Sequence, residues 1–206
     1  MRLPPNNLGS KVVIQKIRSK RHYSDKIQLR KILIKKRKLF NLNAQDSSNN
    51  IANNLIKYLN YMNFSLNNKN ISFYWPIGSE IDTRPSMAAL NDFGSLISLA
   101  STEKNNIIYR LWLPDDLIKI NKIGIQIDTQ EVNKPDIIIC PLIGFDKNLN
   151  RLGRGGGYYD KSLLKLNNTI KIGFAYSIQE IDKVPMEKHD INMDAIITDK
   201  FIYAKN

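Results

Sequence analysis

Residues 136–141, Asp-Ile-Ile-Ile-Cys-Pro, form the segment that says most about the fold. Three consecutive β-branched side chains favour an extended backbone, and Pro141 limits the run. A short run that is apolar at every position, rather than at alternate positions, is typical of a strand buried on both faces. Helices cover both faces of a strand in parallel sheets, so the segment predicts an α/β protein.

The pattern on either side of this segment alternates between short apolar runs and stretches with helical periodicity. Alternating strands and helices predict a three-layer α/β sandwich with a largely parallel central sheet flanked by helices. The expected strands are 71–75, 96–100, 107–113, 123–127, 136–140, 171–176 and 194–198, and the expected helices are 25–40, 46–62, 84–93 and 159–166. We expect one domain over 23–206, preceded by a disordered basic extension, 1–22.

The formal net charge is +12, and it is concentrated at the N-terminus. Residues 1–38 contain 13 Lys and Arg and one acidic residue, Asp25, whereas the remaining residues contain 18 of each sign. A basic arm suggests an anionic partner, namely a nucleotide, a nucleic acid or an acidic membrane surface. The alternative is a solvated basic helix. Only His22 and Tyr23 could stack on bases there, so a nucleic-acid partner is not expected.

Composition excludes several classes of protein. Hydrophobic residues make up 42% of the chain, which allows a sizeable core, but no run approaches the roughly 18 apolar residues of a membrane span. A single cysteine, Cys140, excludes an intrachain disulfide framework and a cysteine-based zinc site. We expect Cys140 to be buried rather than nucleophilic, and the compartment to be reducing. The acid-free N-terminus leaves a mitochondrial or plastid transit peptide open as an alternative.

The chemistry is concentrated in residues 151–160, Arg-Leu-Gly-Arg-Gly-Gly-Gly-Tyr-Tyr-Asp. Four glycines within five positions permit positive φ angles and expose amide groups that can converge on a phosphate. Arg151 and Arg154 add cations that match phosphate geometry, and a helix expected just after the loop adds a favourable dipole. Asp160 offers the carboxylate oxygens that Mg²⁺ prefers. The spacing matches neither a Walker A motif nor a dinucleotide-binding fingerprint. A flexible surface loop is the alternative.

This loop resembles the signature of the 5-formyltetrahydrofolate cyclo-ligase family, and three other blocks agree with that family in order and spacing. The four matching blocks, which span roughly residues 24–200, are Lys26 and Arg30; Phe73–Pro76 with Glu80–Thr83; Pro141 with Phe145-Asp146 and 151–160; and Gln179–Pro185 with Glu187, His189-Asp190 and Asp194–Thr198. Two departures from the family pattern are Leu149, where glycine is usual, and Lys161, where arginine is frequent.

The resemblance implies conversion of 5-formyltetrahydrofolate to 5,10-methenyltetrahydrofolate, with ATP split to ADP and phosphate in the presence of Mg²⁺. The implied ATP-binding residues are Lys26, Arg30, Arg151, Leu152, Gly153, Arg154, Gly155, Gly156, Gly157, Tyr158 and Tyr159. The implied folate-binding residues are Trp75, Glu80, Arg154 and Tyr158, of which Arg154 and Tyr158 are also catalytic. Asp160 and Asp190 are the implied Mg²⁺ ligands. We expect a cytoplasmic monomer whose folate substrate can carry a polyglutamate tail.

Each of these residues has a simpler alternative role. Lys26 and Arg30 could be solvated on a helix, Glu80 could be a surface acid, and Asp190 could cap a turn. Tyr159 could belong to the core, and His189 is expected to be structural or peripheral. A different enzyme hypothesis keeps the phosphate-binding loop and changes the acceptor of the phosphoryl group.

Overall fold

A computed structural model describes the backbone of residues 11–41, 45–104, 106–121 and 124–205, and the side chains of these residues except 11–24 and 45. The helices are α1 (Lys11–Asn41), α2 (Gln45–Tyr61), α3 (Arg84–Asp92) and α4 (Tyr158–Leu163), with a 3-10 turn, η1 (Ser177–Gln179). The strands are β1 (Asn70–Phe73), β2 (Leu96–Glu103), β3 (Asn106–Leu111), β4 (Lys119–Ile120), β5 (Ile125–Gln126), β6 (Glu131–Val132), β7 (Ile137–Pro141), β8 (Gly144–Phe145), β9 (Arg151–Leu152), β10 (Ile170–Ala175), β11 (Ala195–Thr198) and β12 (Ile202–Ala204).

The main sheet has the strand order β12-β11-β10-β7-β1-β2-β3-β6. The pairs from β11 through β10, β7 and β1 to β2 are parallel, and the pairs at the two edges, β11 with β12 and β2 through β3 to β6, are antiparallel. Strands β8 and β9 form a separate hairpin. The expected α/β fold with a largely parallel central sheet is therefore confirmed, and the antiparallel edges are additions that the sequence patterns did not indicate.

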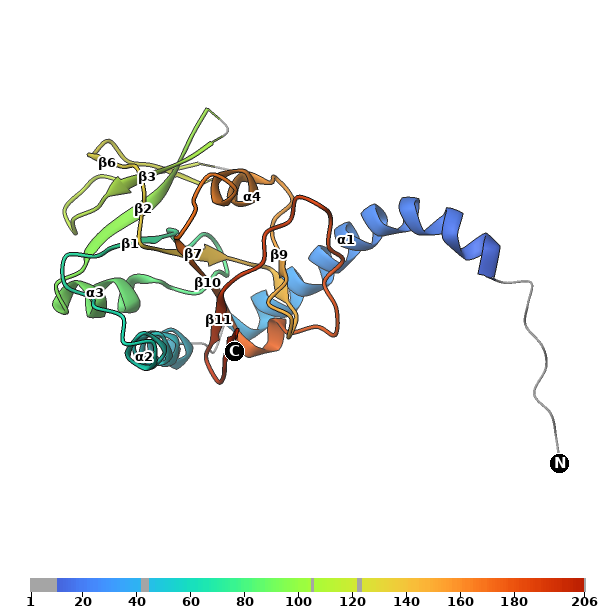
Figure 1. The fold of residues 1–206 in the computed structure, drawn as a ribbon, viewed down its shortest axis with the longest axis horizontal. Helices are drawn as coiled ribbons and strands as arrows, with labels where there is room; N and C mark the ends of the chain where they lie inside the picture. Colours follow the sequence, from blue (N-terminus) through green and yellow to red (C-terminus); the bar gives the residue numbers. More distant parts are fainter. Residues whose placement is uncertain (1–10, 42–44, 105, 122–123, 206) are drawn as a thin grey trace.

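Helices cover both faces of this sheet, as the apolar run at β7 predicted (Figure 1). Ile137 and Ile139 belong to the cluster that includes Ile51 and Leu55 of α2, while Ile138 and Cys140 belong to the cluster that includes Leu163 of α4. Because successive side chains of a strand point to opposite faces, a fully apolar strand serves two cores at once. Strand β7 is thus the centre of the three layers.

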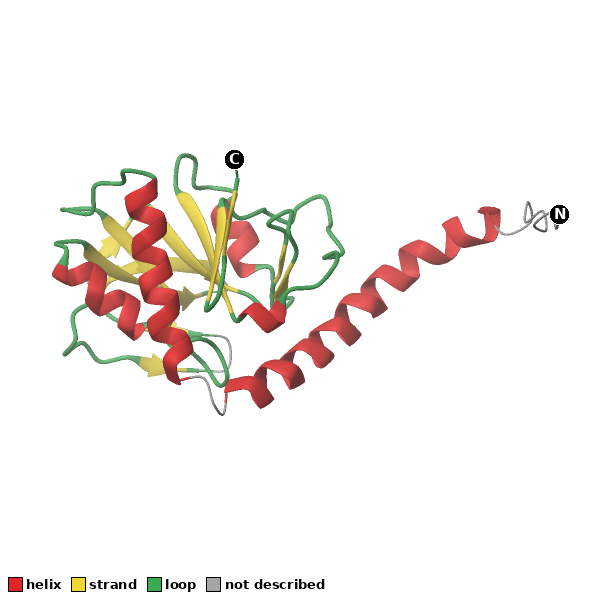
Figure 2. Cartoon of the chain, turned by 90° about the horizontal axis from the view of Figure 1, so that it is seen from below, coloured by secondary structure: helices red, strands yellow, loops and turns green. Residues whose placement is uncertain are grey.

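The C-terminal part of helix α1 runs along one edge of the domain beside the β8–β9 hairpin, and its N-terminal part projects beyond the domain (Figure 2). Its Leu33 packs with Ile143, Leu152 and Val184 in a third, smaller cluster. The helix begins at Lys11, earlier than the expected start at Asp25, so part of the expected basic extension is helical. Residues 1–10 of that extension lie outside the described residues, and the domain boundary at 22 and 23 remains a prediction.

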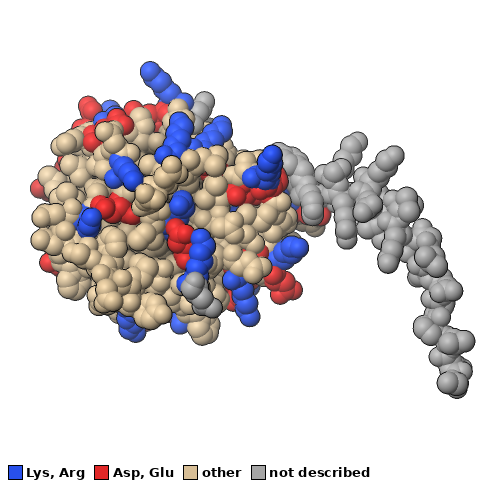
Figure 3. All heavy atoms as spheres, in the orientation of Figure 1, with Lys and Arg blue, Asp and Glu red and all other residues tan. Residues whose placement is uncertain are grey.

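The surface charge follows the sequence-level charge balance. On the face seen in Figure 3, basic and acidic side chains are interspersed over the body of the domain rather than gathered into one basic area. Among the described helices, none combines the length and apolar character needed to cross a membrane.

The backbone conformation and the burial of Leu149 explain why leucine can replace the glycine that is usual at this position in the family. Its φ angle is 62°, in the left-handed region that glycine adopts without cost, and its side chain is buried in the same cluster as Leu163. A side chain in this region costs roughly 1–2 kcal/mol because Cβ approaches the following carbonyl oxygen. Burial of the Leu149 side chain offsets this cost, so the turn keeps the shape that a glycine would give it.

Asp146 fixes the turn that precedes the glycine-rich loop. Its carboxylate is fully buried and accepts hydrogen bonds from the amides of Asn148, Asn150 and Val184 and from the side-chain amide of Asn150. The carboxylate therefore joins the β8–β9 turn to the C-terminal segment. Each of the two carboxylate oxygens accepts two of these four hydrogen bonds.

We expect Asp146→Asn to lower the free energy of unfolding by about 1–3 kcal/mol, because the new amide group would direct N–H donors at other donors. Urea denaturation followed by circular dichroism measures the change. Asp128→Asn, at an exposed position, removes the same charge and should shift the midpoint little. Equal midpoints for the two variants would contradict this role of Asp146.

Candidate active site

A pocket lies at the carboxyl ends of the central parallel strands. The chain passes from β1 to β2 on one side and later to β7 on the other, so the segments that follow β1 and β7 diverge. Open α/β sheets bind ligands at such a switch point. The lining residues are Lys26, Arg30, Tyr74, Trp75, Ile77, Glu80, Ala100, Thr102, Ile107, Gly124, Ile125, Pro141–Ile143, Arg151–Asp160, Glu187, His189 and Asp190.

The pocket therefore brings together all the residues that the sequence analysis assigned to ATP, folate and Mg²⁺, from Lys26 to Asp190. They come from α1, the segment after β1, the glycine-rich loop with the start of α4, and the C-terminal segment before β11. Convergence of segments that are distant in sequence favours a binding site over a flexible surface loop.

Two glycines of the loop lie against side chains. Gly155 has a φ angle of 99°, which other residues adopt only with strain, and a Cβ there would lie 3.2 Å from Cζ of Arg30. A Cβ on Gly156 would lie 2.6 Å from Cε2 of Tyr158, so the Tyr158 ring would have to move. Arg30 donates from Nε to the carbonyl oxygen of Gly153 at 2.9 Å, so α1 supports the loop directly.

Lys26 joins α1 to the C-terminal segment. Its Nζ donates to Glu187 Oε1 and to Asp190 Oδ2, each at 2.9 Å, and only 7% of its side chain is exposed. Burial alone lowers the pKa of Lys26, but the hydrogen bonds and charges of the two carboxylates outweigh burial, so the pKa is raised above 10.5. Lys26 is thus a buried cation held between two acids and not a solvated helix residue.

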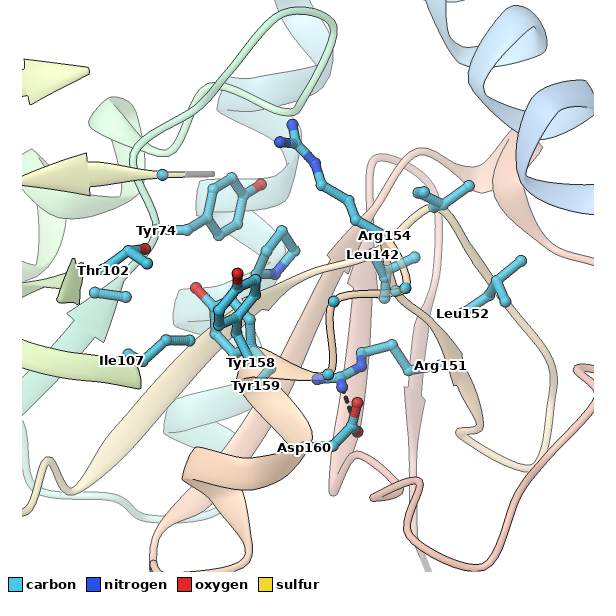
Figure 4. Close-up of a pocket in the computed structure, with 18 of the residues that line it drawn as sticks. Tyr74, Thr102, Ile107, Leu142, Arg151, Leu152, Arg154, Tyr158, Tyr159 and Asp160 are labelled. Carbon is cyan, nitrogen blue, oxygen red and sulfur yellow. Dashed lines mark hydrogen bonds and ion pairs between the residues drawn. The ribbon is translucent and has the colours of Figure 1, made fainter. Parts of the chain in front are cut away.

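Arg151 and Asp160, the first and last residues of the loop segment, form an ion pair at 2.5 Å (Figure 4). Arg151 is buried, its guanidinium carbon lies 5.7 Å from the Tyr159 ring centroid, and its Nε and Nη1 have no hydrogen-bond partner among the described residues. Asp160 also accepts from the amide of Ile191 at 3.3 Å. The pair closes the base of the loop and leaves buried donors beside the pocket.

Glu80 is held at the opposite side of the pocket. Its Oε1 lies 2.9 Å from Arg154 Nη2, and its Oε2 accepts from the amide of Ile77 at 3.0 Å. The Glu80 side chain is 6% exposed, whereas that of Arg154 is 44% exposed. Glu80 is therefore a fixed, buried acid rather than a surface acid, and Arg154 is the more accessible partner.

Aromatic rings form the wall between these charged groups. Figure 4 shows Tyr158 and Tyr159 side by side, with Tyr74, Thr102 and Ile107 on one side and Arg154 with Leu142 on the other. Burial raises the pKa values of Tyr74 and Tyr159 well above 10, so both phenols are neutral at physiological pH. Trp75 also lines the pocket and packs against Trp112, with ring centroids 6.1 Å apart.

Two smaller expectations concern Cys140 and His189. Cys140 is fully buried, and burial raises the pKa of its thiol to about 11, which confirms an inert position. His189 is 65% exposed at the rim of the pocket, where Nε2 lies 3.4 Å from Glu187 Oε2. This placement agrees with a peripheral residue.

Asp160 and Asp190, the implied Mg²⁺ ligands, both line the pocket. Within the described residues, no three His, Cys, Asp or Glu side chains gather in a way that could hold a metal. Mg²⁺ is usually bound by one or two protein carboxylates together with substrate phosphates. Asp160 fits such a site, since its Oδ2 accepts no hydrogen bond from the described residues. Asp190 uses Oδ2 for both Lys26 and the amide of Glu187.

Sequence reasoning missed Arg37 and treated Glu187 only as part of a family block. Arg37 is buried and donates from Nε to Ser79 Oγ at 3.1 Å and from Nη1 to the carbonyl oxygen of Leu142 at 3.3 Å. Lys26, Arg30 and Arg37 are spaced by four and seven residues, which places them on one face of a helix. That spacing was the available signal, but lysines at neighbouring positions concealed it.

Comparisons with known proteins agree on one family. The model of the 5-formyltetrahydrofolate cyclo-ligase family matches residues 22–199. The 5-formyltetrahydrofolate cyclo-ligase of Haemophilus influenzae is 35% identical over 140 residues, which cover 63% of this chain and 75% of that protein. The enzyme of the same name from Escherichia coli K12 is 28% identical over 139 residues, which cover 62% of this chain and 76% of that protein.

Solved structures give the same answer. The 5,10-methenyltetrahydrofolate synthetase of Aquifex aeolicus superposes with a TM-score of 0.68 at 29% identity, covering 87% of this chain and 92% of that chain. The 5,10-methenyltetrahydrofolate synthetase of Mycoplasma pneumoniae superposes with a TM-score of 0.67 at 27% identity, covering 85% of this chain and 99% of that chain.

We expect Lys26→Met to lower the free energy of unfolding by about 1–3 kcal/mol, because Asp190 and Glu187 lose their shared cation. The pKa of Lys26 is raised on folding, so its contribution is complete below pH 10.5 and is lost as the pH rises through the folded value. The difference between wild type and Lys26→Met should therefore stay constant from pH 7 to about 10 and then shrink.

Urea denaturation of both proteins at several pH values measures this difference. Lys31→Met serves as the control, since Lys31 is exposed on the same helix. A difference from wild type that is equally small for Lys26→Met and Lys31→Met would show that the bridge to the C-terminal segment contributes nothing.

Proposed function

This chain belongs to the 5-formyltetrahydrofolate cyclo-ligase family, and we propose how its pocket residues divide the work of the family reaction. The protein converts 5-formyltetrahydrofolate to 5,10-methenyltetrahydrofolate and splits ATP to ADP and phosphate. The observation that supports the division is the meeting of cations, a glycine-rich loop and an aromatic wall in one pocket. One end of the pocket suits a polyphosphate, and the other suits a flat heterocycle.

We assign the ATP phosphates to the end formed by α1 and the loop. Lys26, Arg30, Arg151 and Arg154 would neutralise phosphate charge, and the amides of Gly155, Gly156 and Gly157 would donate hydrogen bonds. Leu152 and Gly153 carry the backbone into this loop, and the Tyr159 ring packs against the guanidinium group of Arg151. Phosphoryl transfer needs positioning and charge neutralisation more than covalent help from the protein, and this end of the pocket offers both.

The ion pairs of the pocket give this assignment a physical consequence. Lys26, Arg151 and Arg154 each pair with a carboxylate, so these cations of the pocket are compensated by acids of the protein itself. A polyphosphate must then compete with those carboxylates or bring a metal ion that satisfies them. Arg154 is the most exposed of the three and changes partner with the least desolvation.

We assign the folate to the aromatic end. Glu80 would accept hydrogen bonds from ring N–H groups of the pterin, for which a fixed buried carboxylate is suited. Trp75 and Tyr158 would pack on the faces of the ring system. Arg154 would stand between the folate formyl group and the phosphates, where positive charge stabilises the oxygen that accepts the phosphoryl group. Tyr158, at the start of α4, would orient the formyl group.

Mg²⁺ would be held by Asp160 and Asp190 together with oxygens of the ATP phosphates. The ion would supply charge neutralisation between the phosphates. The support is the position of both carboxylates at the pocket, where Asp160 accepts from the described residues through Oδ1 and not through Oδ2. Asp190 accepts from Lys26 and from the Glu187 amide through Oδ2, so its Oδ1, which accepts no hydrogen bond from the described residues, would face the ion.

We propose a monomeric enzyme of a reducing compartment, the cytoplasm, that also accepts polyglutamylated folates. A single buried cysteine supports the reducing compartment. The neutral body of the domain argues against a second function in nucleic-acid binding, which would be driven by positive charge.

Absorbance in the methenyl-folate band, followed with purified protein, 5-formyltetrahydrofolate, Mg²⁺ and ATP, tests the reaction against an ATP-free control. We expect the band to grow only with ATP. A flat trace from protein that still binds ATP by calorimetry would mean that the loop binds nucleotide and that the acceptor is a different compound.

Arg154→Ala should lower kcat/KM by about 10²–10³-fold, the usual cost of removing one donor that stabilises developing charge. Steady-state kinetics with ATP as the varied substrate measure the loss. Lys161→Ala is the matched control, because Lys161 is an exposed cation in the last turn of α4. Wild-type turnover by Arg154→Ala would remove Arg154 from the catalytic group.

Asp160→Asn should raise the Mg²⁺ concentration needed for half-maximal turnover, because a neutral amide oxygen is a weaker ligand for this ion than a carboxylate. Calorimetric titration of ATP with and without Mg²⁺ gives a second readout that is independent of turnover. The amide keeps an acceptor for Arg151, and the melting temperature reports whether that contact survives. An unchanged Mg²⁺ titration would exclude Asp160 as a ligand.

A further inference from the structure

Arg37 is a buried cation that the roles proposed above do not use. It lies on α1, on the face that also carries Lys26 and Arg30, but it points beneath the pocket instead of lining it. Its side chain bridges two segments that do line the pocket. Nε donates to Ser79 Oγ at 3.1 Å, and Nη1 donates to the carbonyl oxygen of Leu142 at 3.3 Å.

These two segments are the ones that diverge at the switch point of the sheet. Ser79 immediately precedes Glu80 in the segment after β1, and Leu142 follows β7. The same Leu142 carbonyl accepts a second hydrogen bond, from Gln179 Nε2 at 2.9 Å. Arg37 therefore connects the Glu80 segment to the segment that follows the central strand β7.

Glu80 is consequently flanked by two arginines of different character. Arg154 forms the direct ion pair and is 44% exposed, whereas Arg37 is buried and reaches Glu80 through Ser79. Burial lowers the pKa of Arg37, and the charge of Glu80 is the strongest influence that acts in the opposite direction. Burial raises the pKa values of the nearby phenols of Tyr74 and Tyr159, so neither ring adds a negative charge beside Glu80 at physiological pH.

Burying an arginine is costly unless its charge is compensated. Packing alone does not require an arginine at position 37. Leu33, one turn earlier on the same helix, is buried with an apolar side chain. The charge of Arg37 would stabilise the Glu80 carboxylate when Arg154 moves away from it. Arg154 is assigned to the phosphates during the reaction, and Glu80 would then lose its direct partner.

We propose that Arg37 is a positioning residue for folate binding, which holds Glu80 through Ser79 and remains beside it when Arg154 turns to the phosphates. This inference rests on the proposed role of Glu80. Arg37 touches neither substrate, so its loss should affect folate binding and leave ATP binding intact. A residue that only stabilised the fold would affect both substrates alike.

The test is a double-mutant cycle on Arg37 and Glu80 with both Michaelis constants measured. Arg37→Met should raise KM for 5-formyltetrahydrofolate about tenfold and leave KM for ATP within about twofold. In the Glu80→Gln background, Arg37→Met should change KM for the folate by less than about twofold, because its route of action has been removed. Arg37→Lys should recover part of the loss.

Lys36→Met is the matched control, since Lys36 is an exposed cation next to Arg37, and its Michaelis constants should equal those of wild type. Ser79→Ala serves as a second variant if Arg37→Met does not fold, and it should raise the folate KM about threefold with the ATP KM unchanged. Equal effects on ATP and folate, or effects of Arg37 and Glu80 that simply multiply, would overturn the proposal.

The proposed reaction and the proposed role of Arg37 are tested by different outcomes. If wild type shows no ATP-dependent methenyl band, the proposed function is wrong before any variant is made. If wild type turns over and Arg37→Met or Ser79→Ala leaves the folate KM at the wild-type value, only the inference about Arg37 is wrong.

Discussion

The ion pair between Arg151 and Asp160 is the interaction on which the pocket depends. It joins the first and last residues of the segment that contains all four loop glycines, so it fixes the width of the loop at its base. Removing two charges from water is expensive, and only close geometry with further hydrogen bonds compensates for it. The short contact, the Tyr159 ring and the Ile191 amide supply that geometry. Glycine permits many backbone conformations, but the ion pair at the base of the loop restricts this segment to one of them.

Other charged residues of the pocket are also paired with each other. Its acids Glu80, Glu187 and Asp190 accept from cations that come from other segments of the chain, and Asp160 accepts from Arg151 at the other end of its own loop. A site built for polyphosphate would otherwise carry an excess of buried positive charge when empty. Internal pairing removes this cost and makes ligand binding an exchange of partners. Specificity then depends on which ligand can compensate every carboxylate that it displaces.

Much of the fold was predictable because its signals are local. The β-branched run at 137–139 predicted a strand buried on both faces. The glycines of the loop predicted positive φ angles, which Gly155 and Gly157 adopt. The antiparallel edge strands β6 and β12 were missed because two or three residues carry too little periodicity to indicate a strand. The early start of α1 was missed because its basic stretch has no clear apolar face.

The sequence by itself determined the fold class, the family and the residue types that meet at the site. The tertiary structure decided which of those residues are paired, because hydrogen bonds between residues 161 or 164 positions apart, such as those from Lys26 to Glu187 and Asp190, leave no local pattern. It also decided that Arg37 is buried whereas the neighbouring Lys36 is exposed. Periodicity gives the face of a helix, but only packing against the segments after β1 and β7 determines which cation on that face leaves water.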